Sequence, residues 1–312
     1  MLKRVLRSSG IILLIMSLGA CASRVLEYEK ANELQSNAEY ETKMHIKELP
    51  TEPAVVEAGT TQMAPGKVEA PVAKVKPKEV KPIKVKGSKA LIPEQRQPDI
   101  EDTEGFVGRR PVVDPFRVGE KVTLAVSYFN MTAGYIDLEV LPFVEVNGKR
   151  SYSFRISART NSLFSNFYSV EDQAITYVDY ESLLPFNFQI TVKESKQLAD
   201  IRSFFDWKKL KGNYWVKRVQ KDKGEKSKTL EWDIKSHSQN VISAIYYLRT
   251  FTLTPGKKLA FRVADEGKNI VFTGDVLRRE ELDTDVGKLK TVVVQPNFKV
   301  DGVFKPVGDV FF

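Results

Sequence analysis

The chain has 312 residues, a hydrophobic fraction of 42% and a formal net charge of +8, values that suit a globular protein with its own core. Its single cysteine excludes an intramolecular disulfide, so packing alone has to stabilise the fold. The excess positive charge is concentrated in a segment rich in lysine and proline rather than along one predicted folded face, which argues against a nucleic-acid-binding protein.

The chain begins with the pattern of an export signal. The basic residues Lys3, Arg4 and Arg7 precede the apolar run 11–18, and two small residues then lead directly to Cys21. The apolar run is shorter than the ~20 residues that a membrane-spanning helix requires. Leu-Gly-Ala-Cys resembles the bacterial lipobox, in which the preceding peptide is removed and the cysteine thiol is acylated.

We therefore predict a lipoprotein signal peptide at residues 1–20 and a lipid anchor, with palmitate among its acyl chains, on Cys21. The alternative is an ordinary secretory peptide, but it leaves a lone thiol in an exported protein without an explanation. Two or more acyl chains would give stable membrane anchoring. Because Ala22, and not an aspartate, follows the cysteine, we expect the outer membrane, with the protein facing the periplasm.

Residues 21–111 are predicted to be a disordered tether rich in lysine and proline. Its first part, up to residue 49, is polar and predicts at most a marginal helix. Residues 64–98 repeat Pro, Lys and Val, and such a segment is extended, reaching on the order of 100 Å at ~3.1 Å per residue. A solvated spacer is favoured over a segment that binds anionic polymer.

From residue 112 to residue 312 the pattern predicts a β-rich domain. Apolar residues alternate with polar or small ones in 122–126 and 136–140, and Asn147-Gly148 is typical of a tight hairpin. Further strands are predicted at 169–180, 186–194, 202–208, 214–220, 229–234, 259–263, 270–277, 290–295 and 303–312. Many short strands with frequent turns predict a mainly β fold, an antiparallel curved sheet that forms a half-barrel or barrel.

One segment, at about residues 239–251, has helical spacing instead. Val241, Ile242, Ile245 and Leu248 recur at intervals of three and four, after polar residues that suit an N-cap. The segment is apolar around much of its circumference, so we expect a helix buried against the sheet or across the mouth of a barrel.

These residues support a family resemblance. Residues from about 114 to 312 resemble the exported bacterial family called domain of unknown function 3108. The resemblance rests on Gly119-Glu120-Lys121-Val122, Ala133-Gly134, Ser243-Ala244-Ile245-Tyr246-Tyr247-Leu248-Arg249-Thr250, Gly256-Lys257, Pro296 and residues 304–310. It implies a β-rich envelope domain and no known reaction. Family members continue with another hairpin, whereas this chain stops at Phe312, which predicts an unclosed sheet or an incomplete chain.

The sequence offers little for catalysis or metal binding. His45 lies in the predicted tether, and His237, just before the predicted helix, is the one candidate base in the domain. No nucleophile-elbow pattern accompanies it, and the cysteine and histidine spacing excludes a zinc site. The acidic groups at 265–266 and 280–285 lie near predicted turns and lack the spacing of an EF-hand. We therefore expect no enzyme, no metal and no cofactor.

Aromatic residues give the better lead to a ligand site. Trp207 and Trp215 lie on neighbouring predicted strands beside basic residues, and Tyr246, Tyr247 and Arg249 lie on the predicted helix. One interpretation is a concave aromatic face that binds acyl chains or stacks on sugars. The other is that these rings form the core, which is the commoner role of a single aromatic residue. Arg249 is expected either to pair with a carboxylate or to mark a pocket.

Three functions follow from these observations. The first is a binding module for a lipid-like or glycan ligand, by analogy with half-barrel carriers. The second is a scaffolding lipoprotein that reaches an envelope protein or peptidoglycan through its tether. The third and weakest is a hydrolase that uses His237 or the acidic turns. In each case the membrane is a partner through Cys21, and nucleic acid is not.

Overall fold

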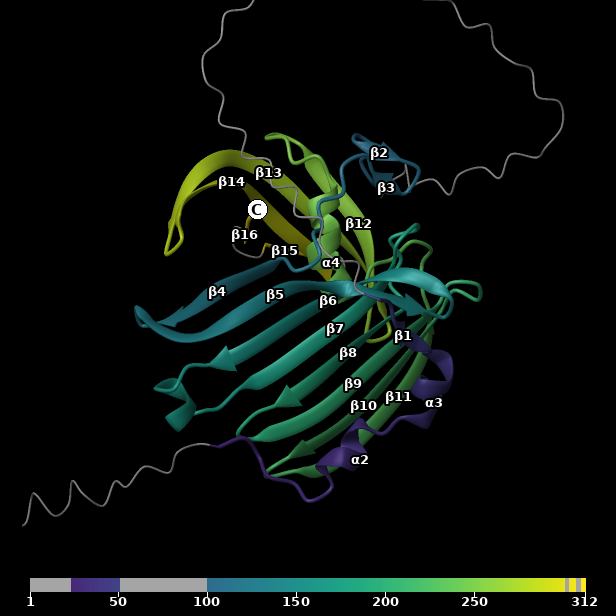
Figure 1. The fold of residues 1–312 in the computed structure, drawn as a ribbon, viewed down its shortest axis with the longest axis vertical. Helices are drawn as coiled ribbons and strands as arrows, with labels where there is room; N and C mark the ends of the chain where they lie inside the picture. The colour runs from purple at the N-terminus through teal and green to yellow at the C-terminus, as the bar shows by residue number, and fades with distance from the viewer. Residues whose placement is uncertain (1–23, 51–99, 301–302, 307–309) are drawn as a thin grey trace, which may run out of the picture. The chain divides into compact units, whose positions relative to one another are not determined.

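The computed structural model describes residues 24–50, 100–300, 303–306 and 310–312. The chain divides into one compact unit made of Met1–Leu49 and Glu94–Phe312 and a second unit, Pro50–Pro93. All the elements below belong to the first unit (Figure 1). The predicted signal peptide, Cys21 and the lysine- and proline-rich stretch 64–98 lie outside the described residues.

Within the described residues, nine antiparallel strands form the larger sheet. Strands β5 to β11 follow one another as a meander, and β1 and β4 both pair with β5 at its edge. The strands are β1 (Ile46–Glu48), β4 (Lys121–Tyr128), β5 (Met131–Val146), β6 (Lys149–Thr160), β7 (Glu171–Asp179), β8 (Asn187–Lys193), β9 (Gln197–Asp206), β10 (Lys211–Gln220) and β11 (Gly224–Asp233).

The Asn147-Gly148 turn between β5 and β6 has φ angles of 51° and 80°, the left-handed conformation that tight hairpins require. A second antiparallel sheet follows the main helix, and a two-stranded ribbon precedes β4. The second sheet contains β12 (Lys258–Asp265), β13 (Lys268–Thr284), β14 (Gly287–Val300), β15 (Val303–Pro306) and β16 (Val310–Phe311), and the ribbon contains β2 (Phe106–Val107) and β3 (Arg110–Pro111).

Helix α4 (Val241–Tyr247) continues into the short 3-10 helix η2 (Leu248–Thr250), and both lie between the two sheets (Figure 1). A second 3-10 turn, η1 (Phe164–Asn166), joins β6 to β7. These bounds confirm the predicted buried helix, and the mainly β, antiparallel curved sheet is confirmed as well. The described part of the sheet stays open and does not close into a barrel. No helix among the described residues has the length and apolar character to cross a bilayer.

The hydrophobic core lies between the larger sheet, α4 and the second sheet. We call the face of the larger sheet that packs on α4 its inner face. There the ring of Phe154 stacks on that of Tyr246, with centroids 4.0 Å apart, and Phe261 from β12 is fully buried in the same cluster. Phe188 and Ile242 belong to a second cluster on this face. Stacked pairs of this kind contribute about 0.5–1.5 kcal/mol beyond the area they bury.

The structure corrects the predicted domain boundaries for residues 24–50. Instead of belonging to a disordered tether, they form α2 (Ala31–Gln35) and α3 (Ala38–Lys43) on the opposite, outer face of the larger sheet, followed by β1 at its edge. Helices of five and six residues are not stable alone. They form here because Leu34 and Tyr40 are buried against the strands, at 5% and 4% exposure.

This packing changes the role of the lysine- and proline-rich stretch in the chain. Strand β1 ends at Glu48 and β2 begins at Phe106, and both belong to the first unit. Residues 51–99 therefore connect two elements of one folded unit, instead of connecting the predicted anchor to the domain.

Candidate functional site

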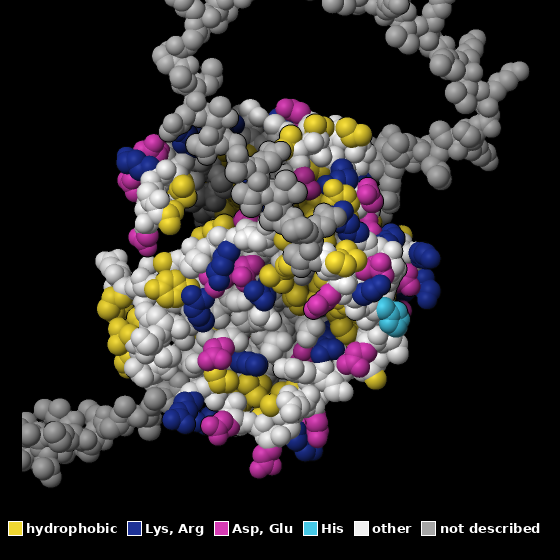
Figure 2. Space-filling model, in the orientation of Figure 1, with side chains coloured by type: hydrophobic (Ala, Val, Ile, Leu, Met, Phe, Trp, Pro, Cys, Tyr) yellow, Lys and Arg dark blue, Asp and Glu magenta, His cyan; other side chains and the backbone are white. Residues whose placement is uncertain are grey.

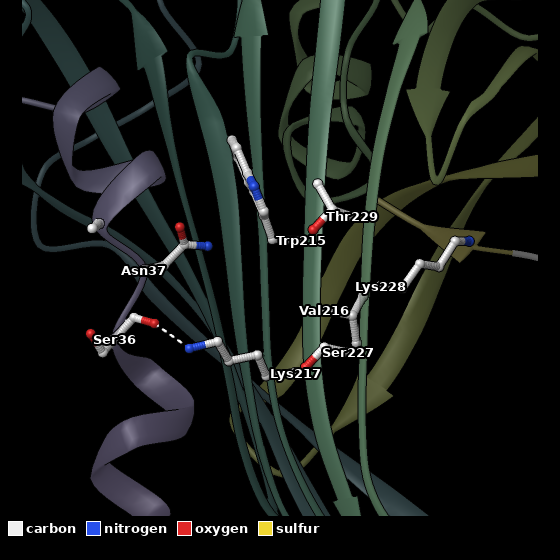
Figure 3. A pocket seen from close by; sticks show the side chains of 9 residues that line it. Ser36, Asn37, Trp215, Val216, Lys217, Ser227, Lys228 and Thr229 are labelled. Atoms are coloured by element: carbon white, nitrogen blue, oxygen red, sulfur yellow. Dashed lines mark hydrogen bonds between the residues drawn. The ribbon is translucent and has the colours of Figure 1, made fainter.

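The described residues contain a pocket of ≈ 330 Å³ on the outer face, where the turn between α2 and α3 crosses β10 and β11 (Figure 3). Its lining comes from three separate segments of the chain, and six of the nine lining residues have polar side chains. The lining residues are Ser36, Asn37, Ala38, Trp215, Val216, Lys217, Ser227, Lys228 and Thr229.

Alternation along β10 explains which side chains reach this pocket. Tyr214 belongs to the inner cluster and Trp215 to the outer one, so Lys217 also points outward. On β11, Thr229 lies opposite Trp215 and Ser227 lies opposite Lys217. Because both β11 residues are short, they leave open space beside the large indole.

The α2–α3 turn is fixed above these strands by several hydrogen bonds. The Lys217 ammonium donates to the carbonyl oxygens of Glu33 (3.1 Å) and Ser36 (2.6 Å). Asn37 caps α3 by accepting a hydrogen bond from the backbone N–H of Tyr40 at 3.0 Å. Figure 3 shows Lys217 reaching toward Ser36, and the side chain of Asn37 directed toward the strands.

Trp215 forms the floor of the pocket and is held rigidly. Its ring packs edge-on against Tyr40, with centroids 6.1 Å apart, and its Nε1–H donates to the Glu39 carboxylate at 3.0 Å. The Tyr40 hydroxyl in turn accepts a hydrogen bond from the side-chain amide of Asn187 at 2.6 Å. Burial raises the pKa of Tyr40, so its hydroxyl stays protonated.

A buried ion pair lies on the same face, next to the pocket. The Arg202 guanidinium Nε is 2.7 Å from the Asp200 carboxylate, and both side chains are less than a tenth exposed. Burial raises the pKa of the Asp200 carboxyl, and the charge of Arg202 opposes this shift. Arg202 also lies over the Tyr40 ring, 5.0 Å from its centroid, so the pair helps to fix α3.

The polar side chains of the pocket are suited to hydrogen bonding with a polar ligand. It offers serine and threonine hydroxyls, an amide and the Lys217 ammonium. The hydrogen-bond partners of that ammonium are neutral carbonyl oxygens, so a positive charge remains at the pocket wall. Lys228 lines the pocket, but its side chain points to the opposite face, over Tyr214 (Figure 3). Among the described residues, no cluster of three or more His, Cys, Asp or Glu side chains could hold a metal ion.

The structure does not bring the five predicted site residues together. Trp215 lines the pocket, whereas Trp207 stacks on Phe205 and donates to the carbonyl oxygen of Pro185 at 2.8 Å. Tyr246 and Tyr247 are buried core residues, at 2% and 3% exposure. The predicted aromatic rings are therefore distributed over two faces of the sheet, and those on the inner face contribute to a filled core.

Arg249 forms the ion pair that was one of its two predicted roles. Its guanidinium donates to both oxygens of the Glu120 carboxylate, at 2.6 and 3.0 Å, and to the carbonyl oxygen of Pro115 at 2.9 Å. Bidentate geometry of this kind fixes η2 to the segment that precedes β4. His237 lies in the turn before α4 with a φ of 61°.

Sequence reasoning missed Ser36, Asn37, Ser227 and Thr229. A local signal existed for Asn37, because an asparagine before Ala-Glu-Tyr is typical of a helix N-cap. The alternation of β10 also placed Lys217 on the same face as Trp215. No local signal showed that residues from the N-terminal segment would cover this face.

Comparison with known families identifies the domain. A family model described as "Protein of unknown function (DUF3108)" matches residues 123–311, which is more than half of the chain. The chain belongs to this family. The match confirms the resemblance found in the sequence, and it includes β5 to β14 but not α2 and α3. Neither the curated proteins nor the solved structures that were compared gave a match.

Proposed function

We propose that this chain is a lipid-anchored protein of the bacterial cell envelope whose domain binds a glycan-type ligand without catalysing a reaction. The observation that carries the proposal is the polar pocket beside Trp215. Its hydroxyls, its amide and the Lys217 ammonium match the hydroxyl and carboxylate groups of an acidic sugar or of peptidoglycan. Polar side chains outnumber apolar ones in the lining, and Trp215 offers a ring that can stack on a sugar, so the glycan is favoured over the lipid-like ligand.

A binding role is supported further by the composition of the pocket. Its lining contains serine and threonine hydroxyls but no histidine or carboxylate that could act as the general base to activate them. The Lys217 ammonium already donates hydrogen bonds to two carbonyl oxygens, so it serves to hold the α2–α3 turn in place.

The envelope location rests on the lipobox-like sequence at 18–21. We expect Cys21 to carry the lipid anchor, and Ala22 to direct the protein to the outer membrane with the domain in the periplasm. Mass spectrometry of the mature N-terminal peptide tests this step directly. An unmodified Cys21 with residues 1–20 still attached would contradict the proposed location.

Filling the pocket tests the binding role. In Thr229→Trp a large ring occupies the space beside Trp215, so the affinity for soluble peptidoglycan fragments, measured by calorimetry, should fall at least about tenfold. Lys226→Trp places the same ring on the same strand but on the inner face, because Lys226 alternates with Ser227. This control should keep the affinity of the unaltered chain. Equal affinities in both variants would show that the pocket is not the ligand site.

A second candidate, a scaffold that binds an envelope protein, is favoured by the edge strand β4. All eight residues of β4 are exposed, and within the described part of the chain the strand pairs with β5 on one side. Such an edge can accept a strand from a partner. Under this alternative, Ala125→Pro should abolish cross-linking of β4 to an envelope protein in cells, and Thr229→Trp should leave it unchanged.

A further inference from the structure

Five large apolar side chains are exposed at one end of the larger sheet. We define this apolar tip as Tyr128, Phe129 and Met131 at the β4–β5 turn, with Leu163 and Phe167 in the β6–β7 connection. Their exposed fractions are 59%, 80%, 50%, 53% and 78% in that order. Single exposed apolar residues are normal, but a group of this kind marks an interaction surface. Figure 2 shows hydrophobic side chains gathered at the left-hand end of the larger sheet, where Figure 1 shows these turns.

The two turns of the apolar tip are joined to each other. The backbone N–H of Asn161 donates to the carbonyl oxygen of Ala133 at 2.9 Å, and its side-chain amide donates to that of Thr132. The Tyr128 ring contacts Phe164, with centroids 6.4 Å apart. Phe129 has a φ of 48°, a left-handed conformation that is unfavourable for an aromatic residue. The rings are therefore presented by an ordered structure.

The chain enters the domain at this same end of the sheet. In an antiparallel meander the β4–β5, β6–β7, β8–β9 and β10–β11 turns share one end. Hydrogen bonds link them in sequence, from Ser195 N–H to the carbonyl oxygen of Ser169 and from Lys221 N–H to that of Lys196. The N–H of Leu26 donates to the carbonyl oxygen of Glu194 at 2.9 Å, in the β8–β9 turn.

The predicted lipid anchor is therefore close to this end. Cys21 lies five positions before Leu26 in the chain, and five residues span at most ~17 Å. An acylated Cys21 would hold Leu26, and with it the β8–β9 turn, within that distance of the bilayer surface. Lys196, Lys221 and Lys223 are exposed in the neighbouring β8–β9 and β10–β11 turns, where they can contact anionic headgroups.

We propose that the apolar tip inserts into the interfacial region of the membrane that holds the Cys21 anchor, so that the domain docks on the bilayer through its strand ends. Aromatic and aliphatic side chains flanked by lysines suit this region, where a ring contacts acyl chains beside charged headgroups. The inference rests on the acylation of Cys21 in the proposed function. It adds a second point of membrane contact, on the folded domain itself.

The test uses the full acylated protein in vesicles of phosphatidylethanolamine and phosphatidylglycerol. Ser162→Cys places a thiol beside Leu163 and keeps the five apolar residues of the tip. Because acylation blocks the thiol of Cys21, the new cysteine is the one reactive thiol. A fluorophore there should be quenched by nitroxide-labelled lipids at least about threefold more strongly than one at Lys209→Cys. Lys209 lies in the β9–β10 turn, at the other end of strands that are ~30 Å long.

Two further measurements make the outcome decisive. Adding Phe129→Ser and Phe167→Ser should reduce the quenching to the level of the Lys209→Cys control, and both residues are too exposed for these changes to unfold the domain. Equal quenching at the two labelled positions, with Cys21 shown by mass spectrometry to be acylated, would overturn the proposal and leave the proposed function standing. An unmodified Cys21 would overturn both. A fluorophore at Ser162→Cys that is quenched neither by aqueous iodide nor by the nitroxide-labelled lipids would mean that a protein covers the tip. That result would also overturn the proposal.

Discussion

Asp265 is a partly buried carboxyl at the end of β12. Burial, together with the neighbouring charge of Glu266, raises its pKa to about 6, and the backbone N–H of Glu266 and the charge of Lys268 oppose the shift. The Glu266 carboxylate is itself held by the Tyr214 hydroxyl at 2.7 Å. The folded protein therefore binds a proton at Asp265 at pH values where the unfolded chain has released it.

This shift predicts a pH dependence of stability. Because the folded pKa lies above the unfolded value of 3.8, the contribution of Asp265 is fully present below pH 4 and is lost as the pH rises through about 6. Asp265→Asn should remove this loss and raise the free energy of unfolding at pH 7.5 by on the order of 2 kcal/mol. Urea denaturation at pH 4 and pH 7.5 measures the difference.

Asp285→Asn is the matched control, since Asp285 is exposed in the turn between β13 and β14. It should leave the pH profile unchanged. If Asp265→Asn keeps the slope of the parent protein between pH 4 and pH 6, the carboxyl is hydrated in the folded state and the assignment is wrong.

At the scale of elements, α4 begins at a fully buried cap. The Asn240 side-chain oxygen accepts hydrogen bonds from the N–H groups of Ile242 (3.0 Å) and Ser243 (2.7 Å). Its amide group donates to the Thr176 hydroxyl and to the Asn187 carbonyl oxygen, at 2.9 and 2.8 Å. One side chain therefore starts the helix and joins it to β7 and β8.

Asn240→Ala should destabilise the protein by about 3 kcal/mol, because it removes the cap and leaves buried polar groups without partners. Asn37→Ala removes the half-buried cap of α3 and should cost only about 1 kcal/mol. Thermal unfolding of the two variants gives the comparison. Equal losses would mean that the contacts of Asn240 with β7 and β8 contribute nothing measurable.

Elements with a strong local pattern were predictable. The Asn147-Gly148 hairpin, the alternation along β10 and the helical spacing of α4 all depend on neighbouring residues, and the structure confirms them. Alternation states that Tyr214 and Trp215 point to opposite faces. Alternation does not predict what packs on each face. The sequence therefore could not show whether Trp207, Tyr246 and Tyr247 belong to the core or to a ligand site.

At the scale of the whole molecule, residues 24–50 cover the outer face and complete the pocket. Tyr40 and Met44 share a buried cluster with Trp215, and Leu34 packs on Leu198 and Val219. The turn from Ser36 to Ala38 supplies one wall of the pocket. This segment therefore contributes to stability and to the candidate site together.

A chain that begins at residue 100 should therefore have a Tm lower by on the order of 10 °C than one that begins at residue 24, since several large apolar side chains lose their cover. Differential scanning calorimetry measures this shift, and the tryptophan emission of the shorter chain should move to longer wavelength. The chain that begins at residue 24 is the control for loss of the leader and of Cys21. An unchanged Tm would mean that the N-terminal segment packs too weakly to matter.

The sequence by itself determined the strands, the tight turns, the buried helix and the family, because each depends on short-range pattern or on motifs within the domain. Only the tertiary structure decided that residues 24–50 fold onto the sheet, that the pocket lies beneath them and that exposed rings gather at the end where the chain enters. The physical reason is that short helices and single rings have no fixed position of their own. The surfaces that cover them come from residues more than a hundred positions away.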